Sequence, residues 1–148
     1  MVRDRIYFRT MALVHETLYG LFKDPYEPLR VAGLRPGERV LEVGCGPGFF
    51  TVPASQIVGP QGEVTSLDVS PTAVAHVRRK VAQAHATNVN VIQANAGDTH
   101  LPAQSFDLAF LFGIGRVVGD LEEIWAELHR LLKTGGTLAI EGRLRPPA

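Results

Sequence analysis

The spacing of apolar residues changes along the chain from helical to alternating. Near the start, apolar side chains recur three or four positions apart, which predicts a helix from about Arg9 to Lys23 and a shorter one over Pro25–Ala32, ended by Gly33. From residue 39 onward, short apolar runs alternate with stretches of helical spacing. The runs that we expect to form strands are Arg39–Val43, Glu63–Asp68, Val89–Gln93, Phe106–Phe112 and Thr137–Glu141.

Three further helices are expected between these strands. The first covers Phe49–Val58, and the second begins at Pro71, where Ser70 is a suitable N-cap. Asp120 opens the third, which carries a stripe of apolar residues and ends near Lys133 and the glycines that follow it. Strands that alternate with helices predict an α/β fold: a Rossmann-like, doubly wound and mainly parallel sheet of about five strands, with helices on both faces. We expect one domain over residues 1–148, with a helical N-terminal extension (1–33) and a Rossmann-like core (34–148).

Composition and charge narrow the function classes only slightly. Lys plus Arg equals Asp plus Glu at 15 each, so the chain has no net positive charge that would attract nucleic acid. The cluster Arg78–Lys80 is interpreted as a solvated helix face. The single cysteine, Cys45, excludes an intrachain disulfide, and the dispersed histidines give no indication of a metal site. No signal peptide or membrane span is evident, and a cytoplasmic location is expected.

A glycine-rich turn follows the first expected strand. Its glycines are Gly44, Gly46 and Gly48, at the carboxyl end of a parallel strand, where such sheets bind ligands. The spacing differs from a dinucleotide fingerprint, and the Lys-Ser/Thr of a phosphate-binding loop is absent. Glu42 precedes the turn, and its carboxylate would repel a pyrophosphate but suits a ligand with a cationic end.

The stretch LEVGCGPGFF (residues 41–50) resembles motif I of class I S-adenosylmethionine-dependent methyltransferases, especially the small ubiquinone/menaquinone-methyltransferase-like subgroup. Later segments match in order over about residues 34–142. The resemblance implies S-adenosylmethionine as cofactor, S-adenosylhomocysteine as product, and in-line transfer of the sulfonium methyl group. It places Glu42 near the methionine end, Asp68 on the ribose and Asn95 at the adenine. The cofactor-binding residues it implies are Glu42, Gly44, Cys45, Gly46, Gly48, Asp68, Val69, Asn95, Ala96 and Phe112.

Two departures from the family pattern bear on function. Asn95 stands where the family usually has an acid, although its amide can still accept from adenine, and Asp98 lies nearby. The family's sheet also continues with a sixth and a seventh strand, for which no residues follow here. The fifth strand would then form an apolar edge, which favours a homodimer; the alternative is that residues 143–148 fold back as a cover.

The acceptor and the catalytic groups are not identified by the sequence. No general base can be assigned, and His15, His100 and Arg116 are candidates for contact with substrate. A small-molecule acceptor is favoured over a macromolecule. Two other functions remain open: a non-catalytic module that binds S-adenosylmethionine or S-adenosylhomocysteine or scaffolds a partner, and a nicotinamide-dinucleotide oxidoreductase, which Glu42 and the Gly48-Phe49 pair disfavour.

Overall fold

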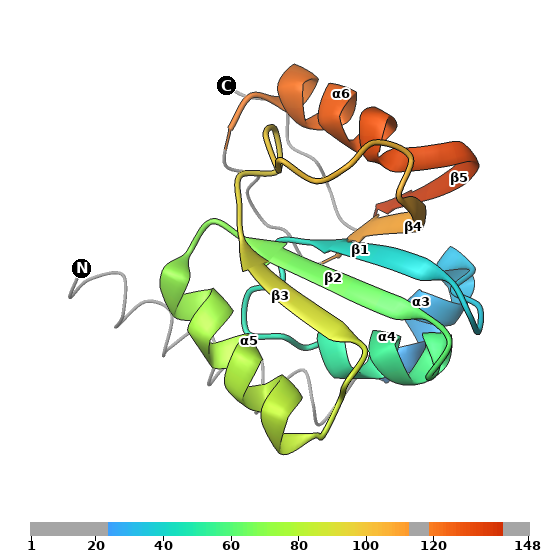
Figure 1. Ribbon diagram of the computed structural model, residues 1–148, viewed down its shortest axis with the longest axis vertical. Helices are drawn as coiled ribbons and strands as arrows, with labels where there is room; N and C mark the ends of the chain where they lie inside the picture. Colours follow the sequence, from blue (N-terminus) through green and yellow to red (C-terminus); the bar gives the residue numbers. More distant parts are fainter. Residues whose placement is uncertain (1–23, 113–118, 141–148) are drawn as a thin grey trace.

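The computed structural model describes residues 24–112 and 119–140. Within them, a parallel sheet is flanked by helices on both faces (Figure 1). The strands are β1 (Arg39–Val43), β2 (Glu63–Asp68), β3 (Val89–Gln93), β4 (Phe106–Leu111) and β5 (Leu132–Ile140). The helices are α3 (Tyr26–Ala32), α4 (Thr51–Val58), α5 (Pro71–Gln83) and α6 (Leu121–Leu131).

The strand order in the sheet is β3-β2-β1-β4-β5, and every neighbouring pair is parallel. The order reverses between β1 and β4, so the ends of these two strands form the switch point at which open α/β sheets bind ligands. The expected Rossmann-like class is therefore confirmed. The predicted helix over 9–23 lies outside the described residues.

The central strands are buried on both faces, which explains the nearly continuous apolar sequence of β4. Val40, Val64 and Leu108 pack beneath α3 and α4. Leu41, Leu67 and Ala109, each an odd number of positions further along its strand, pack beneath α6. Figure 1 shows α3, α4 and α5 on one side of the sheet and α6 on the other. Alternate side chains of each strand therefore belong to two separate cores.

Local sequence signals determine most of the helix boundaries. Ser70 caps α5, with its hydroxyl accepting from the Ala73 amide at 3.3 Å. Asp120 caps α6 and accepts from the amides of Glu122 and Glu123. Gly33 ends α3 with a φ of +95°, a left-handed conformation that glycine adopts without strain. The caps predicted from the sequence are thus confirmed.

Three element boundaries differ from the sequence prediction. Helix α4 begins at Thr51, because residues 46–50 form the turn itself. Strand β4 ends at Leu111, one residue before Phe112. Strand β5 begins at Leu132, five residues earlier than expected, because Leu132 already has extended dihedrals and pairs with Phe106. The register shifts after that pair, so that Leu108 lies opposite Thr137. The predicted last residue of this strand, Glu141, lies outside the described residues.

Candidate functional site

The glycine turn after β1 adopts a backbone that most residues resist. Gly44, Gly46 and Gly48 have φ values of +72°, +49° and +76°, all in the region that favours glycine. A Cβ added at Gly48 would lie 2.9 Å from Cγ2 of Val77, so the turn also approaches α5 closely. Lys80 Nζ donates to the carbonyls of Pro47 and Gly48, at 3.2 and 3.4 Å. The turn is therefore held from α5 by packing and by a cation.

The basic cluster 78–80 is consequently more than a solvated face. Arg78 remains exposed, but its guanidinium donates to the Val91 carbonyl through Nε at 3.2 Å and through NH2 at 2.8 Å. These contacts, with those of Lys80, join α5 to β3 and to the glycine turn. The basic cluster in the sequence does not predict these three carbonyl partners, because Val91, Pro47 and Gly48 lie far from it along the chain.

Asp68, the last residue of β2, links two loops at the carboxyl edge of the sheet. Its Oδ2 accepts from the Gly46 amide at 2.9 Å, and its Oδ1 accepts from the Ser70 amide at 2.9 Å. Each carboxylate oxygen retains a second lone pair. Asp68 therefore fixes the glycine turn beside the start of α5 and can still accept two hydrogen bonds from a ligand.

Glu42 is a buried carboxylic acid within β1, with only 3% of its surface exposed. Its Oε2 accepts from the Thr51 hydroxyl at 2.6 Å and from the Ser66 hydroxyl. Burial raises its pKa to about 7, against the lowering effect of the Ser66 and Thr51 hydrogen bonds; the charge of Asp68 adds to the rise. A cationic ligand nearby would favour the ionised form, so Glu42 is suited to respond to a sulfonium or an ammonium group.

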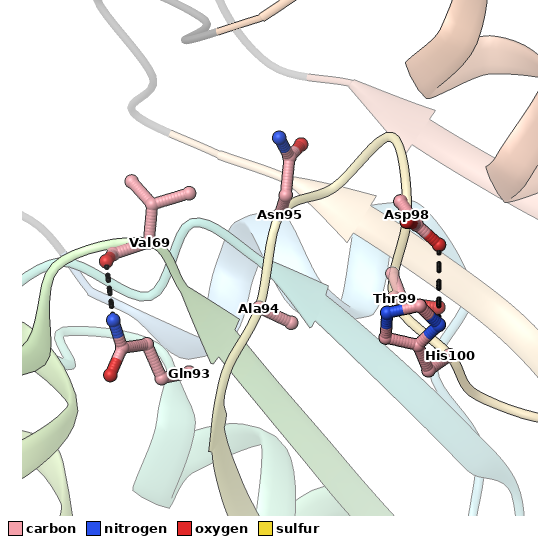
Figure 2. A pocket seen from close by; sticks show the side chains of 7 residues that line it. All are labelled: Val69, Gln93, Ala94, Asn95, Asp98, Thr99 and His100. Atoms are coloured by element: carbon pink, nitrogen blue, oxygen red, sulfur yellow. Dashed lines mark hydrogen bonds and ion pairs between the residues drawn. The ribbon is translucent and has the colours of Figure 1, made fainter.

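A hollow of about 410 Å³ opens where β2 and β3 end (Figure 2). Its lining residues are Val69, Gln93, Ala94, Asn95, Asp98, Thr99 and His100. Val69 contributes an exposed apolar side chain, while its carbonyl accepts from Gln93 Nε2 at 3.2 Å. On the far side in Figure 2, His100 Nδ1 lies 3.4 Å from Asp98 Oδ1. An apolar wall with polar groups around it is typical of a small-molecule site.

The structure distributes the predicted residues unevenly around this hollow. Val69 and Asn95 line it, and Asp68 directly precedes Val69. The Asn95 Oδ1 accepts from the Gly97 amide at 2.9 Å, which orients the side chain. Ala96 is buried in the core beneath α6. Glu42 and the glycines belong to the neighbouring β1 end of the sheet.

Cys45 and Phe112 pack against other apolar side chains of the protein. Cys45 is buried, and that burial, together with the charges of Glu42 and Asp68, raises the pKa of its thiol, which disfavours the reactive thiolate form. Phe112 follows β4 and belongs to an aromatic cluster, with ring centroids 5.3 Å from Phe50 and 4.9 Å from Phe110. The cluster extends to Phe49 in the glycine turn through Phe50.

Sequence reasoning missed several residues that shape the site. Thr51 and Ser66 hold Glu42, but both lie in elements that contain other polar residues, so the sequence does not single them out. Gln93, the last residue of β3, and Thr99, in the connection that follows, also line the hollow, but no motif in the sequence marks either residue. Tyr26 on α3 donates from its hydroxyl to Gln56 on α4 and so joins these two helices.

Within the described residues, no group of three or more His, Cys, Asp or Glu side chains could hold a metal ion. Nor does any helix in the described ranges have the length and apolar character needed to cross a membrane. The predicted contacts of His15 and Arg116 fall outside those ranges.

The structure is a Rossmann-like domain with a glycine turn at the switch point of its sheet and a hollow at the neighbouring ends of β2 and β3. The profile of a family described as "Methyltransferase domain" matches residues 40–136. The chain belongs to this methyltransferase domain family.

Relatives in the family have several named activities. The chain is 36% identical over 114 residues to a demethylmenaquinone methyltransferase of Listeria monocytogenes, covering 76% of this chain and 48% of the relative. It is 33% identical over 146 residues to ribosomal RNA small subunit methyltransferase G of Methylococcus capsulatus, covering 98% and 67%. The chain thus spans about half the length of the Listeria relative.

Solved structures of related proteins share the fold. A SAM dependent methyltransferase from Aquifex aeolicus superposes with a TM-score of 0.78 at 29% identity, covering 95% of this chain and 76% of that protein. A TehB-like SAM-dependent methyltransferase from Corynebacterium glutamicum gives a TM-score of 0.73 at 18% identity, covering 92% and 72%. The sheet and helices described above are therefore those of methyltransferase structures.

Proposed function

We propose that the chain is an S-adenosylmethionine-dependent methyltransferase domain that transfers a methyl group to a small-molecule acceptor and releases S-adenosylhomocysteine. The observation that carries the proposal is the Asp68–Gly46 hydrogen bond of 2.9 Å, beside a buried acid and a glycine turn with three left-handed residues. A ligand with a cationic end, a ribose diol and a purine has complementary groups along this edge of the sheet.

The roles that we propose follow the order of the strands. Glu42 would act electrostatically on the methionine end, and the backbone of the glycine turn would approach the cofactor closely. Asp68 would accept from the two ribose hydroxyls, while Val69 packs against the adenine and Asn95 and Ala96 contact its edge. Cofactor binding is thus assigned to Glu42, Gly44, Cys45, Gly46, Gly48, Asp68, Val69, Asn95, Ala96 and Phe112.

The chemistry demands positioning more than acid–base catalysis. The sulfonium is already a charged leaving group, so the domain's contribution is to hold the methyl carbon in line with the acceptor atom and to exclude water. The aromatic cluster of Phe49, Phe50, Phe110 and Phe112 lies where β1 and β4 end. Phe110 is fully buried, so the partly buried rings of Phe49, Phe50 and Phe112 would be the ones to favour an apolar, ring-containing acceptor over a polyanion. The name of the Listeria relative, a demethylmenaquinone methyltransferase, points to the same class.

Two measurements test this proposal. Titration calorimetry with S-adenosylmethionine, S-adenosylhomocysteine and NAD should show binding of the first two and much weaker binding of NAD. Turnover should then be measured with a quinol acceptor and with small ribosomal subunits. Methylation of the subunits alone would contradict the small-molecule assignment, and absence of binding at millimolar S-adenosylmethionine would contradict the function itself.

The edge of the sheet supports a further proposal, a homodimer. Strand β5 is the last in the described sheet, and its Leu138 and Ile140 are 38% and 41% exposed. Both are paired in register with residues of the core beneath α6, Ala109 and Leu111, so they extend that apolar face to the edge. A second copy pairing here would cover both the side chains and the free backbone groups. We also propose a cytoplasmic setting, in keeping with the single, free and buried Cys45.

A further inference from the structure

The segment that forms most of the hollow has no regular secondary structure of its own. Five of the seven lining residues are Ala94, Asn95, Asp98, Thr99 and His100. They belong to the connection between β3 and β4, in which His100 and Gln104 have φ values of +58° and +49°. Non-glycine residues in this region are strained and persist only where their surroundings hold them. Something outside the segment must therefore fix its shape.

The support comes from α6, on the other side of the connection. Glu127 is a carboxylate with only 9% of its surface exposed, and its Oε1 accepts from the Thr99 amide at 3.1 Å and from the Thr99 hydroxyl at 2.5 Å. The same hydroxyl oxygen accepts from the Leu101 amide at 3.2 Å. The Glu127 side chain of α6 therefore holds Thr99, and the Thr99 hydroxyl holds the backbone of Leu101, two residues further along the segment.

Arg130 completes the arrangement one turn along the helix. It donates from Nε to Glu127 Oε2 and from NH2 to Glu127 Oε1, both at 2.7 Å, and NH2 also donates to the Leu101 carbonyl at 2.7 Å. This bidentate geometry restricts both side chains. The segment packs closely on α6 elsewhere too: a Cβ added at Gly97 would lie 3.3 Å from Cβ of Glu123.

We infer that Glu127 is a positioning residue for the nucleobase end of the cofactor site: it fixes the pocket-lining segment through Thr99, although it does not itself line the hollow. The inference rests on the proposed function. Removal of its charge would weaken the hold of α6 on Thr99, and through Thr99 on the Leu101 amide, so this part of the segment would have to be ordered again each time a nucleoside binds. The Arg130 hydrogen bonds lower the pKa of Glu127 to about 2, so its carboxylate is ionised throughout the neutral range.

The test compares dissociation constants in folded variants, measured by calorimetry well below the midpoint of thermal unfolding. Glu127→Gln should weaken the binding of both adenosine and S-adenosylhomocysteine about tenfold, the loss expected for one hydrogen bond to a charged group. Thr99→Val should act in the same direction, whereas Thr99→Ser, which keeps the hydroxyl, should bind as the wild type does. In Glu127→Gln, hydrogen exchange should accelerate at the amides of Thr99 and Leu101.

The control is Asp107→Asn, which weakens a different ion pair, the 2.9 Å contact between Asp107 and Lys133 at the amino end of β4. It should lower the unfolding temperature without changing either dissociation constant. Wild-type affinity in Glu127→Gln, alongside a lowered unfolding temperature, would overturn the positioning role and leave the proposed function intact. Failure of the wild-type protein itself to bind adenosine and S-adenosylhomocysteine would overturn both.

Discussion

The carboxylate of Asp68 and the amide of Gly46 are joined by a hydrogen bond of 2.9 Å, although 22 positions separate them in the sequence. The bond connects the end of β2 to the glycine turn that follows β1. Because the other oxygen of Asp68 accepts from the Ser70 amide, the side chain cannot rotate without losing two backbone contacts. The acid that we assign to the ribose is thus oriented before any ligand arrives, and preorganisation of this kind lowers the entropic cost of binding.

Asp68→Ala should weaken S-adenosylmethionine binding by about 1.5–3 kcal/mol, the range for loss of a charged hydrogen-bond partner. The variant also frees the Gly46 amide, so the effect should lie toward the upper end. Titration calorimetry measures it, with Asp107→Ala as the control: that carboxylate also holds two donors, the Arg39 amide and Lys133, but at the opposite end of the sheet. An unchanged dissociation constant in folded Asp68→Ala would reject the ribose assignment.

Glu42 should make the stability of the protein depend on pH. The pKa of Glu42 is about 7 in the folded chain, against an ordinary value of 4.5. Between these two pH values the folded state therefore retains a proton that the unfolded state has lost. The free energy of unfolding should therefore fall as the pH rises from about 4.5 to about 7, by at most about 3 kcal/mol, and level off above that. Chemical denaturation of the wild type and of Glu42→Gln at several pH values isolates this contribution, since the two proteins differ only at Glu42. Parallel curves for the two proteins would contradict the raised pKa.

The same acid should couple cofactor binding to proton release. A sulfonium or ammonium group near Glu42 favours its ionised form, so affinity for S-adenosylmethionine should increase as the pH rises through 7. In Glu42→Gln, that increase should disappear. Calorimetry in buffers of different ionisation enthalpy counts the protons released: wild-type protein below pH 7 should release a fraction of one proton more than the variant. Equal release would place the cationic end of the ligand away from Glu42.

Gly48→Ala should destabilise the fold through two separable effects. The φ of +76° is unfavourable for alanine, and the new Cβ would lie 2.9 Å from Val77, a stiff, fully buried side chain in α5. The expected cost is about 2–4 kcal/mol, the sum of a left-handed backbone penalty and overpacking. Gly37→Ala is the matched control, because Gly37 has a φ of +85° with nothing within 4 Å of an added Cβ. It should show the backbone penalty alone, about 1–2 kcal/mol. Equal losses in the two variants would show that the turn yields readily at Val77.

The boundaries of β1, β2 and β3 could be predicted from the sequence because each strand is a short apolar run with strong turn or capping residues at its ends, such as Gly44 and Ser70. The start of β5 could not. Leu132 continues the apolar spacing of α6, and only its pairing with Phe106 makes it extended. At Leu132 the local apolar spacing predicts a helix, but the pairing with Phe106 in the sheet determines the conformation.

The contrast between local sequence pattern and tertiary contacts also explains which parts of the site were predictable. Glu42, the glycine turn and Asp68 all lie at strand ends in the linear sequence, so a motif identifies them. The support of Thr99 by Glu127 joins residues 28 positions apart, and neither residue belongs to a local signature. Glu127 does carry one hint: it is a charged residue three positions after Ile124 and four before Leu131, on the buried stripe of α6. A charge at such a position requires a partner, although the sequence does not say which.

The proposed dimer leads to the last prediction. Leu138 and Ile140 are exposed on the same face of the edge strand β5, so replacing both with lysine should add charges to the interface without disturbing the buried core. Charged side chains on an edge strand oppose pairing with a second strand. Sedimentation or light scattering at micromolar concentration should give a dimer mass for the wild type and a monomer mass for the double variant, with similar unfolding temperatures for both at low protein concentration.

A substitution of exposed Val31 on α3, Val31→Lys, serves as the control, because it removes an exposed apolar side chain from a different element. It should leave the dimer intact. A monomer mass for the wild type that does not change on raising the concentration would contradict the dimer, and in that case the β5 edge must be covered within the chain itself or tolerated in solvent.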